Sequence, residues 1–161
     1  MQAKALKLLI DSLHRLEDTV LISALASMLI LAIIQIVLRN FFDSGFLWAE
    51  SSLRILVLWV AILGAMVATR ENNHINIDTL SRYVPENWQP AIRLLTSLFA
   101  AAICGTVAWH AFVFVHFEYE DQTIAFASVP TWACQSILPF GFTVMAFRFS
   151  YSAIIDLLGK R

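Results

Sequence analysis

The chain has 161 residues, of which 59% are hydrophobic and 14% are charged, and its formal net charge is −1. A hydrophobic share this high excludes an ordinary soluble domain. The near-neutral net charge argues against binding to nucleic acid. The composition is instead typical of a protein that lies in a membrane and contacts lipid.

Four apolar stretches follow one another along the chain. A helix that rises ~1.5 Å per residue needs about 20 residues to cross a hydrocarbon core of ~30 Å. Each stretch has roughly this length, and the expected spans are residues 19–40, 47–69, 94–117 and 126–148. No internal repeat divides the chain. The sequence predicts an all-α membrane protein in which residues 1–161 form a single domain with four transmembrane helices.

The basic residues indicate how these helices are oriented, because cytoplasmic segments carry an excess of Lys and Arg. The two ends and the middle connection would share one side of the membrane. They hold Lys4, Lys7, Arg15, Arg70, Arg82, Arg93, Arg148, Lys160 and Arg161, whereas the opposite side has only Arg39. We therefore expect both termini and the middle connection to be cytoplasmic. The acidic turn with Glu118, Glu120 and Asp121 would face outward.

The middle connection, residues 70–93, mixes apolar and polar residues. Ile75, Ile77 and Leu80 alternate with polar neighbours, as in an amphipathic segment that lies along the membrane surface. Trp88 would anchor this segment at the level of the lipid headgroups, and Trp48 would mark the interface at the start of the second span. The sequence predicts an interfacial segment between the second and third helices.

The second span has two different faces. Small residues allow another helix to approach closely, whereas bulky side chains suit lipid. We therefore expect close packing on the small face and lipid on the bulky face. The small face holds Glu50, Arg54, Val57, Ala61, Gly64, Ala65 and Ala68, and the bulky face holds Ile55, Trp59, Ile62, Leu63 and Met66.

Glu50 and Arg54 are four residues apart, a spacing at which they can pair along a helix. One interpretation places them near the outer membrane surface, where their side chains reach water. The other, which we favour, is a buried polar contact with another span or with a partner subunit. An unpaired charge in lipid costs at least ~2.5 kcal/mol, and both residues lie on the small face.

The third span repeats this design more weakly, with bulky residues such as Phe99, Ile103 and His110 opposite a small face. A second tight packing face is therefore expected. Its members are Ser97, Ala101, Cys104, Gly105, Ala108 and Ala111. In the fourth span, Pro130 fits a helix start, whereas Pro139 should kink the helix and free the carbonyl of Gln135.

The sequence predicts no cofactor, no metal site and no enzymatic activity. A haem held by two histidines needs ligands from facing helices, but His110 and His116 lie on one helix and point in different directions. Cys104 and Cys134 occur singly, without the paired spacing of a redox or zinc site.

Three motifs and a group of late residues stand out along the chain. They are W-x-E-x-x-x-R-x-x-x-x-W (Trp48, Glu50, Arg54, Trp59), G-x-x-x-A-x-R (Gly64, Ala68, Arg70), H-I-x-I-D (His74, Ile75, Ile77, Asp78) and the late residues Pro130, Pro139 and Arg148. Together they resemble the small membrane subunit of tripartite ATP-independent periplasmic (TRAP) transporters, the DctQ-like family. The resemblance covers essentially the whole chain, although Ser51 stands where many members carry a second acidic residue. This departure puts any role of paired carboxylates in doubt.

The resemblance implies a non-catalytic subunit of a sodium-coupled organic acid transporter in the bacterial inner membrane. In that family a periplasmic binding protein delivers the substrate, and the large subunit holds the substrate and sodium sites. The small subunit packs on the large subunit's fixed scaffold. Glu118, Glu120 and Asp121 would then help to dock the binding protein by charge complementarity. The sequence itself offers no midplane ligand cluster and no discontinuous helix for independent transport.

A four-span multidrug-type exporter that acts as a homodimer is the alternative. Such an exporter would need a carboxylate deep in a span, conventionally the first. Residues 19–40 contain only Gln35 as a strongly polar residue, which disfavours this alternative.

Overall fold

The computed structural model describes residues 2–42, 45–71, 88–126 and 128–157. Four long helices dominate it: α1 (Gln2–Phe42), α2 (Leu47–Glu71), α4 (Gln89–Glu120) and α6 (Ile137–Leu157). Four helical segments are long and apolar enough to cross a membrane, namely Asp11–Phe42, Trp48–Arg70, Gln89–Glu120 and Thr131–Leu157. The prediction of an all-α protein with four transmembrane helices is confirmed. Most of the predicted amphipathic segment, together with the H-I-x-I-D motif, lies outside the described residues.

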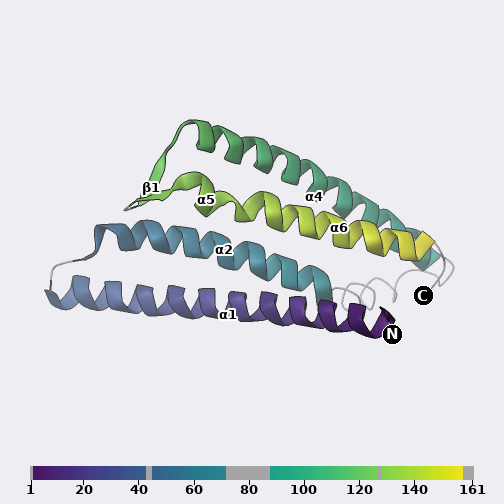
Figure 1. Ribbon diagram of the computed structural model, residues 1–161, viewed down its shortest axis with the longest axis horizontal. Coiled ribbons are helices and arrows are strands. Elements are labelled where there is room, and N and C mark those ends of the chain that lie inside the picture. Colours follow the sequence, from purple (N-terminus) through teal and green to yellow (C-terminus); the bar gives the residue numbers. More distant parts are fainter. Residues whose placement is uncertain (1, 43–44, 72–87, 127, 158–161) are drawn as a thin grey trace.

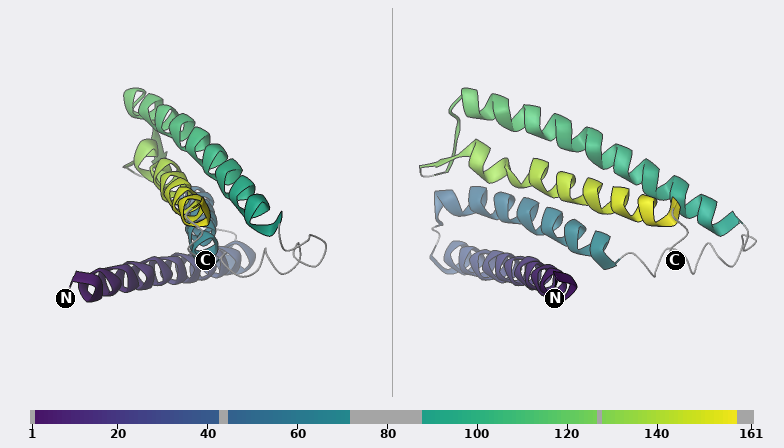
Figure 2. Two further views of the ribbon diagram at one scale, coloured as in Figure 1. Left: turned by 90° about the vertical axis from the view of Figure 1, so that its right-hand side faces the viewer. Right: turned by 45° about the vertical axis from the view of Figure 1, so that its right-hand side comes forward.

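The helices form a row in the order α1, α2, α6 and α4 (Figures 1 and 2). The long helices alternate in direction in chain order, and α6 lies between α2 and α4, so that α2 and α6 are parallel neighbours in the row (Figure 1). The first turn of α1 and the last turn of α6 lie at the same end of the molecule (Figure 1). This arrangement agrees with the expectation that the two chain ends share one side of the membrane.

The core lies between α2 and α6. Ile62, Leu63 and Met66 of α2 are buried against Ile137 and Met145 of α6. The expectation that the bulky face of α2 contacts lipid was therefore wrong for these three α2 residues. Large side chains pack well against a neighbouring helix where that helix offers space for them.

Gly141 of α6 supplies part of this space. A Cβ atom added at this position would collide with the side chain of Ile62. The absence of a side chain therefore lets α2 and α6 approach closely at this point. By contrast, a Cβ atom added at Gly64 or Gly105 would have no heavy atom within 4 Å.

The packing face predicted for the third span is largely confirmed, because α4 packs chiefly against α6. The outward side of α4 carries exposed bulky residues, including Phe99 and Ile103. Gly105 is the exception on the small face, since it is exposed. The half-buried small residues are Ser97, Ala101, Cys104, Ala108 and Ala111.

The fourth span begins later than predicted and is interrupted. An antiparallel pair of short strands, β1 (Ile124–Phe126) and β2 (Val129–Pro130), occupies the start of the expected 126–148 span. The short helix α5 (Thr131–Gln135) follows, with Pro130 at its N-cap. The helix is interrupted for one residue at Ser136, between α5 and α6, within the helical span Thr131–Leu157. Pro139 has no N–H to donate to the Gln135 carbonyl, so the interruption falls at the turn where the sequence predicts a kink.

Candidate functional site

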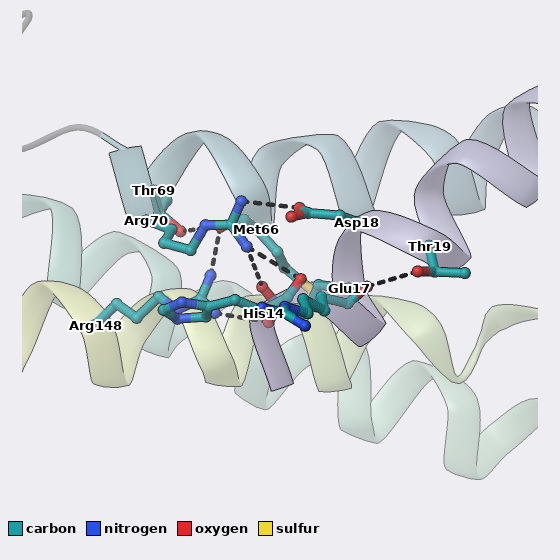
Figure 3. Close-up of polar contacts among 9 residues, drawn as sticks. His14, Glu17, Asp18, Thr19, Met66, Thr69, Arg70 and Arg148 are labelled. Atoms are coloured by element: carbon teal, nitrogen blue, oxygen red, sulfur yellow. Dashed lines mark hydrogen bonds and ion pairs between the residues drawn. The ribbon is translucent and has the colours of Figure 1, made fainter. Parts of the chain in front are cut away.

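Four charged side chains gather where α1, α2 and α6 meet (Figure 3). Glu17 and Asp18 come from α1, Arg70 from α2 and Arg148 from α6; we call them the charge cluster. With two acidic and two basic members, the cluster has no net formal charge.

Arg70 binds two successive acidic residues of α1. Its Nη2 donates to Asp18 Oδ1 at 2.8 Å, and its Nη1 lies 3.8 Å from Glu17 Oε2. Nη1 also donates to the carbonyl oxygen of His14 at 3.2 Å. The planar guanidinium group, with its several N–H donors, can donate to Asp18 and to the His14 carbonyl together. Glu17 Oε2 is buried without a hydrogen-bond partner among the described residues, so Arg70 acts on it through charge alone. Arg70 thereby fixes the last turn of α2 to α1.

Arg148 connects the third helix of the cluster. Its Nη2 donates to Glu17 Oε1 at 2.6 Å, and its Nη1 donates to the carbonyl oxygen of Met66 on α2. Glu17 therefore lies between two guanidinium groups, one from α2 and one from α6. A single α1 carboxylate thus links both neighbouring helices.

Three of the four side chains are shielded. Those of Arg70 and Glu17 are each 17% exposed and that of Arg148 is 23% exposed, whereas that of Asp18 is 44% exposed. Charge-assisted hydrogen bonds are stronger than neutral ones when water is excluded. Removing one partner of a buried pair leaves the other charge without compensation, which typically costs about 3–5 kcal/mol. The cluster consequently makes the positions of the three helices depend on one another.

The sequence-based prediction missed this cluster. It treated Arg70 and Arg148 as orientation signals and family-motif positions, and it assigned Glu17 and Asp18 no role. A usable signal exists in retrospect, because two adjacent acids directly precede the apolar stretch at Thr19, at the membrane side expected for both arginines.

Glu50 and Arg54 pair with each other, as their spacing predicts, with 2.7 Å between Glu50 Oε1 and Arg54 Nη2. However, their side chains are 73% and 78% exposed. The prediction that the pair contacts another span of this chain is therefore wrong. The pair points away from the chain's own core. Contact with a partner subunit remains a prediction.

The rest of the small α2 face is also largely open. Val57, Ala61 and Ala68 are exposed, whereas Gly64 and Ala65 are half-buried. The structure therefore leaves on α2 a strip of small residues with an ion pair toward one end. We call this strip, which comprises Glu50, Arg54, Val57, Ala61, Gly64, Ala65 and Ala68, the open face.

The acidic turn after α4 is held partly by local contacts. The Glu118 carboxylate accepts a hydrogen bond from the Thr123 hydroxyl, and Glu120 Oε1 lies 3.5 Å from His116 Nδ1. Asp121 ends the helix through its backbone N–H, which donates to the Phe117 carbonyl. Both Glu120 and Asp121 are exposed.

The two tryptophans predicted to mark the membrane interface are exposed. Trp48 is 44% exposed and Trp88 is 66% exposed. Trp48 also packs at a tilt against Phe46, with 5.5 Å between the ring centroids. His110 and His116 are both exposed on α4. Among the residues that the structure describes, no group of three or more His, Cys, Asp or Glu side chains could hold a metal ion.

The fold and the charge cluster define a multi-pass α-helical membrane protein whose buried charges join helices to one another. Residues 28–159 match the DctQ component of the tripartite ATP-independent periplasmic transporters. The match covers most of the sequence, so the chain belongs to this family. The resemblance identified from the sequence motifs is confirmed, and the chain is a TRAP small permease subunit.

Individual relatives agree with this assignment. A putative TRAP transporter small permease protein of Haemophilus influenzae is 33% identical over 92 residues, which cover 57% of each chain. The C4-dicarboxylate TRAP transporter small permease protein DctQ of Vibrio cholerae is 22% identical over an alignment of length 172. This alignment covers 90% of this chain and 72% of the relative.

A third relative is a longer protein. The sialic acid TRAP transporter permease protein SiaT of Haemophilus influenzae is 32% identical over 132 residues, which cover 77% of this chain and 20% of SiaT. The chain thus spans little more than half of the first relative and a fifth of SiaT.

Proposed function

We propose that this chain is the non-catalytic scaffold subunit of a sodium-coupled TRAP transporter that takes up an organic acid. Its partners are the large membrane subunit and a periplasmic substrate-binding protein. It lies in the bacterial inner membrane with both termini in the cytoplasm. Family membership supports the transporter role, and the C4-dicarboxylate and sialic acid named for two relatives support an organic acid substrate.

The observation that carries the scaffold role is the open face of α2. The face combines small residues with the exposed Glu50–Arg54 pair, and the chain's own helices leave it largely uncovered. Helices in membranes associate closely through small residues, and polar groups at such a contact stabilise it. The open face therefore suits a helix of the large subunit. Partner-subunit packing is assigned to Glu50, Arg54, Ala61, Gly64, Ala65 and Ala68.

The charged residues support a packing role rather than independent transport. Alternating access needs a solute site near the membrane midplane whose exposure changes. In the described part of the chain, the charge cluster lies near one end of the bundle, and the Glu50–Arg54 pair lies near the start of α2, at the other end. Neither arrangement provides a midplane site for a solute.

The homodimeric exporter is disfavoured by both the family and the contacts. The acidic residues Glu17 and Asp18 of α1 are paired with Arg70 and Arg148 of the same chain. Gln35, the strongly polar residue of the first predicted span, accepts a hydrogen bond from the Phe46 backbone N–H at 3.3 Å. Gln35 of α1 is thereby bonded to the residue that directly precedes α2.

Co-purification with the large subunit tests the scaffold role. Gly64→Leu places a branched side chain on the open face and should abolish recovery of the large subunit, whereas the subunit itself remains folded. Gly105→Leu is a matched control, because neither glycine has a neighbouring atom where a Cβ would lie. Arg54→Ala should reduce recovery more than Glu50→Ala, since it leaves a carboxylate buried in the contact. Full recovery with both Gly64→Leu and Arg54→Ala would show that the open face contacts lipid.

The acidic turn is proposed to help dock the binding protein. Glu118, Glu120 and Asp121 form a negative site that attracts a positively charged surface, which chiefly raises the association rate. Replacing them together with Gln, Gln and Asn should slow association at low salt and weaken its salt dependence. If surface-binding kinetics in nanodiscs were unchanged at every salt concentration, the turn would have no docking role.

A further inference from the structure

A single residue, Ser136, separates α5 from α6 in the fourth span. The hairpin of β1 and β2 is joined to α5, because the Thr131 backbone N–H donates to the Thr123 carbonyl at 2.9 Å. We call the hairpin and α5, residues 124–126 and 128–135, the outer segment. It lies at the end of the bundle opposite the last turn of α6 (Figure 1). Helices bend where their hydrogen-bond pattern is interrupted, so the outer segment can turn relative to α6 unless other contacts hold it.

Side chains take up backbone carbonyls on the outer side of this interruption. The Ser136 hydroxyl donates to the Ala133 carbonyl at 2.8 Å. The indole N–H of Trp59 on α2 donates to the Cys134 carbonyl at 2.9 Å. Interrupted helices persist in membranes because hydroxyl side chains and neighbouring helices satisfy the backbone groups that the interruption frees. The first bond is local, whereas the second joins α5 to a helix 75 residues earlier in the sequence.

Helix α2 thus contacts the fourth span on both sides of the interruption. Beyond it, Ile62 packs so closely against Gly141 of α6 that an added Cβ would collide. Before it, α5 packs chiefly against α4 rather than α2, and the Trp59 bond is made to a residue that is only 8% exposed. An indole N–H and a carbonyl that are both removed from water are costly to leave unpaired. The bonded arrangement is therefore favoured over one in which α5 turns away from α2.

We propose that Trp59 is a positioning residue that holds the outer segment on α2, with Ser136 as the hinge. The indole N–H, and not only the size of the ring, sets the direction of α5 relative to α6. The acidic turn directly precedes the hairpin, so it takes a fixed position relative to the Glu50–Arg54 pair at the start of the same α2. The benefit of this geometry for docking the binding protein rests on the proposed function, whereas the positioning by Trp59 does not.

Spin-label distances across the interruption test the proposal in the full chain. Cys104→Ala and Cys134→Ala remove the native thiols and keep the backbone carbonyl at position 134. Ile124→Cys on the hairpin and Phe147→Cys on α6 then carry the labels, because both positions are exposed. Double electron–electron resonance in nanodiscs should give one narrow distance distribution. A hydrogen bond of ordinary net strength changes a two-state ratio about two- to tenfold, so removing the N–H should raise the population of displaced distances by this factor.

Two changes at Trp59 remove the N–H in different ways. Trp59→Phe also makes the ring smaller, whereas the tryptophan analogue benzothienylalanine keeps its size and has sulfur in place of the N–H. Both should broaden the distances across the interruption. Trp109→Phe is the matched control, because Trp109 is an exposed tryptophan of α4, and it should change nothing. A second label pair, Ile103→Cys on α4 and Ile154→Cys on α6, does not cross the interruption and should keep its distance in every variant.

The proposal is overturned if the analogue at position 59 leaves the distances across the interruption unchanged, or if Trp109→Phe broadens them equally. It is also overturned if the analogue prevents folding or broadens the second label pair to the same extent, since Trp59 would then support the whole fold rather than position one segment. These distances are measured without the binding protein. A failure of the proposed docking role would therefore appear only in the association kinetics and not in the distances.

Discussion

Arg148 of α6 donates a hydrogen bond to Glu17 Oε1 of α1 at 2.6 Å, although 131 residues separate the two in the sequence. Since Glu17 also lies 3.8 Å from Arg70 of α2, this one carboxylate links three helices. Most of α1 is exposed to the surroundings of the bundle. We therefore regard the charge cluster as a main determinant of how α1 is held.

A double-mutant cycle with Glu17→Gln and Arg148→Gln should measure this link. Each single change should destabilise the chain by up to about 3–5 kcal/mol, because the partner charge stays shielded. The two changes should be non-additive, with a coupling energy of about 0.5–3 kcal/mol. Reversible unfolding in detergent micelles provides the measurement.

The matched control for this cycle uses Glu50→Gln and Arg54→Gln. These side chains also form an ion pair, but they are 73% and 78% exposed in the chain. Exposed i,i+4 pairs typically contribute only about 0.3–0.5 kcal/mol. Equal coupling energies in the two cycles would contradict the structural role assigned to the charge cluster.

Gly141→Ala should destabilise the chain even though alanine favours helix formation. The added methyl group would collide with Ile62 in the contact between α2 and α6. Overpacking of this kind typically costs about 1–3 kcal/mol. The thermal midpoint in detergent should fall for Gly141→Ala and stay level for Gly105→Ala, which has open space at the same atom. An unchanged midpoint for Gly141→Ala would mean that the two helices are further apart than described.

Reporter fusions should establish the orientation of the bundle. Because the basic residues cluster on one side, fusions after Arg82 and Arg161 should show cytoplasmic activity, and a fusion after Asp121 should show periplasmic activity. Cytoplasmic activity after Asp121 would be incompatible with the proposed topology.

The sequence predicts the helices better than their contacts. Hydropathy identifies four spans because a membrane requires about 20 apolar residues in each. It does not reveal the hairpin before α5, because Ile124 and Phe126 are as apolar as a helix interior. The local Glu50–Arg54 pair follows from its spacing, whereas the Glu17 contacts depend on distant segments and were missed.

The α2 faces show a related difficulty. Small residues do favour close packing, but the sequence does not say whether the neighbour is another span or another protein. Here the bulky residues Ile62, Leu63 and Met66 pack within the chain. The open face is left for the proposed partner. The prediction that the two faces of α2 have different neighbours was useful, but the prediction that these three bulky residues contact lipid was wrong.

Reconstituted transport tests the central claim most directly. The small subunit, the large subunit and both together would be placed in liposomes with a sodium gradient, the binding protein and candidate organic acids. We expect uptake only when both subunits are present, with Gly64→Leu abolishing it and Gly105→Leu retaining it. Uptake by the small subunit alone, or full uptake by the large subunit alone, would contradict the scaffold role.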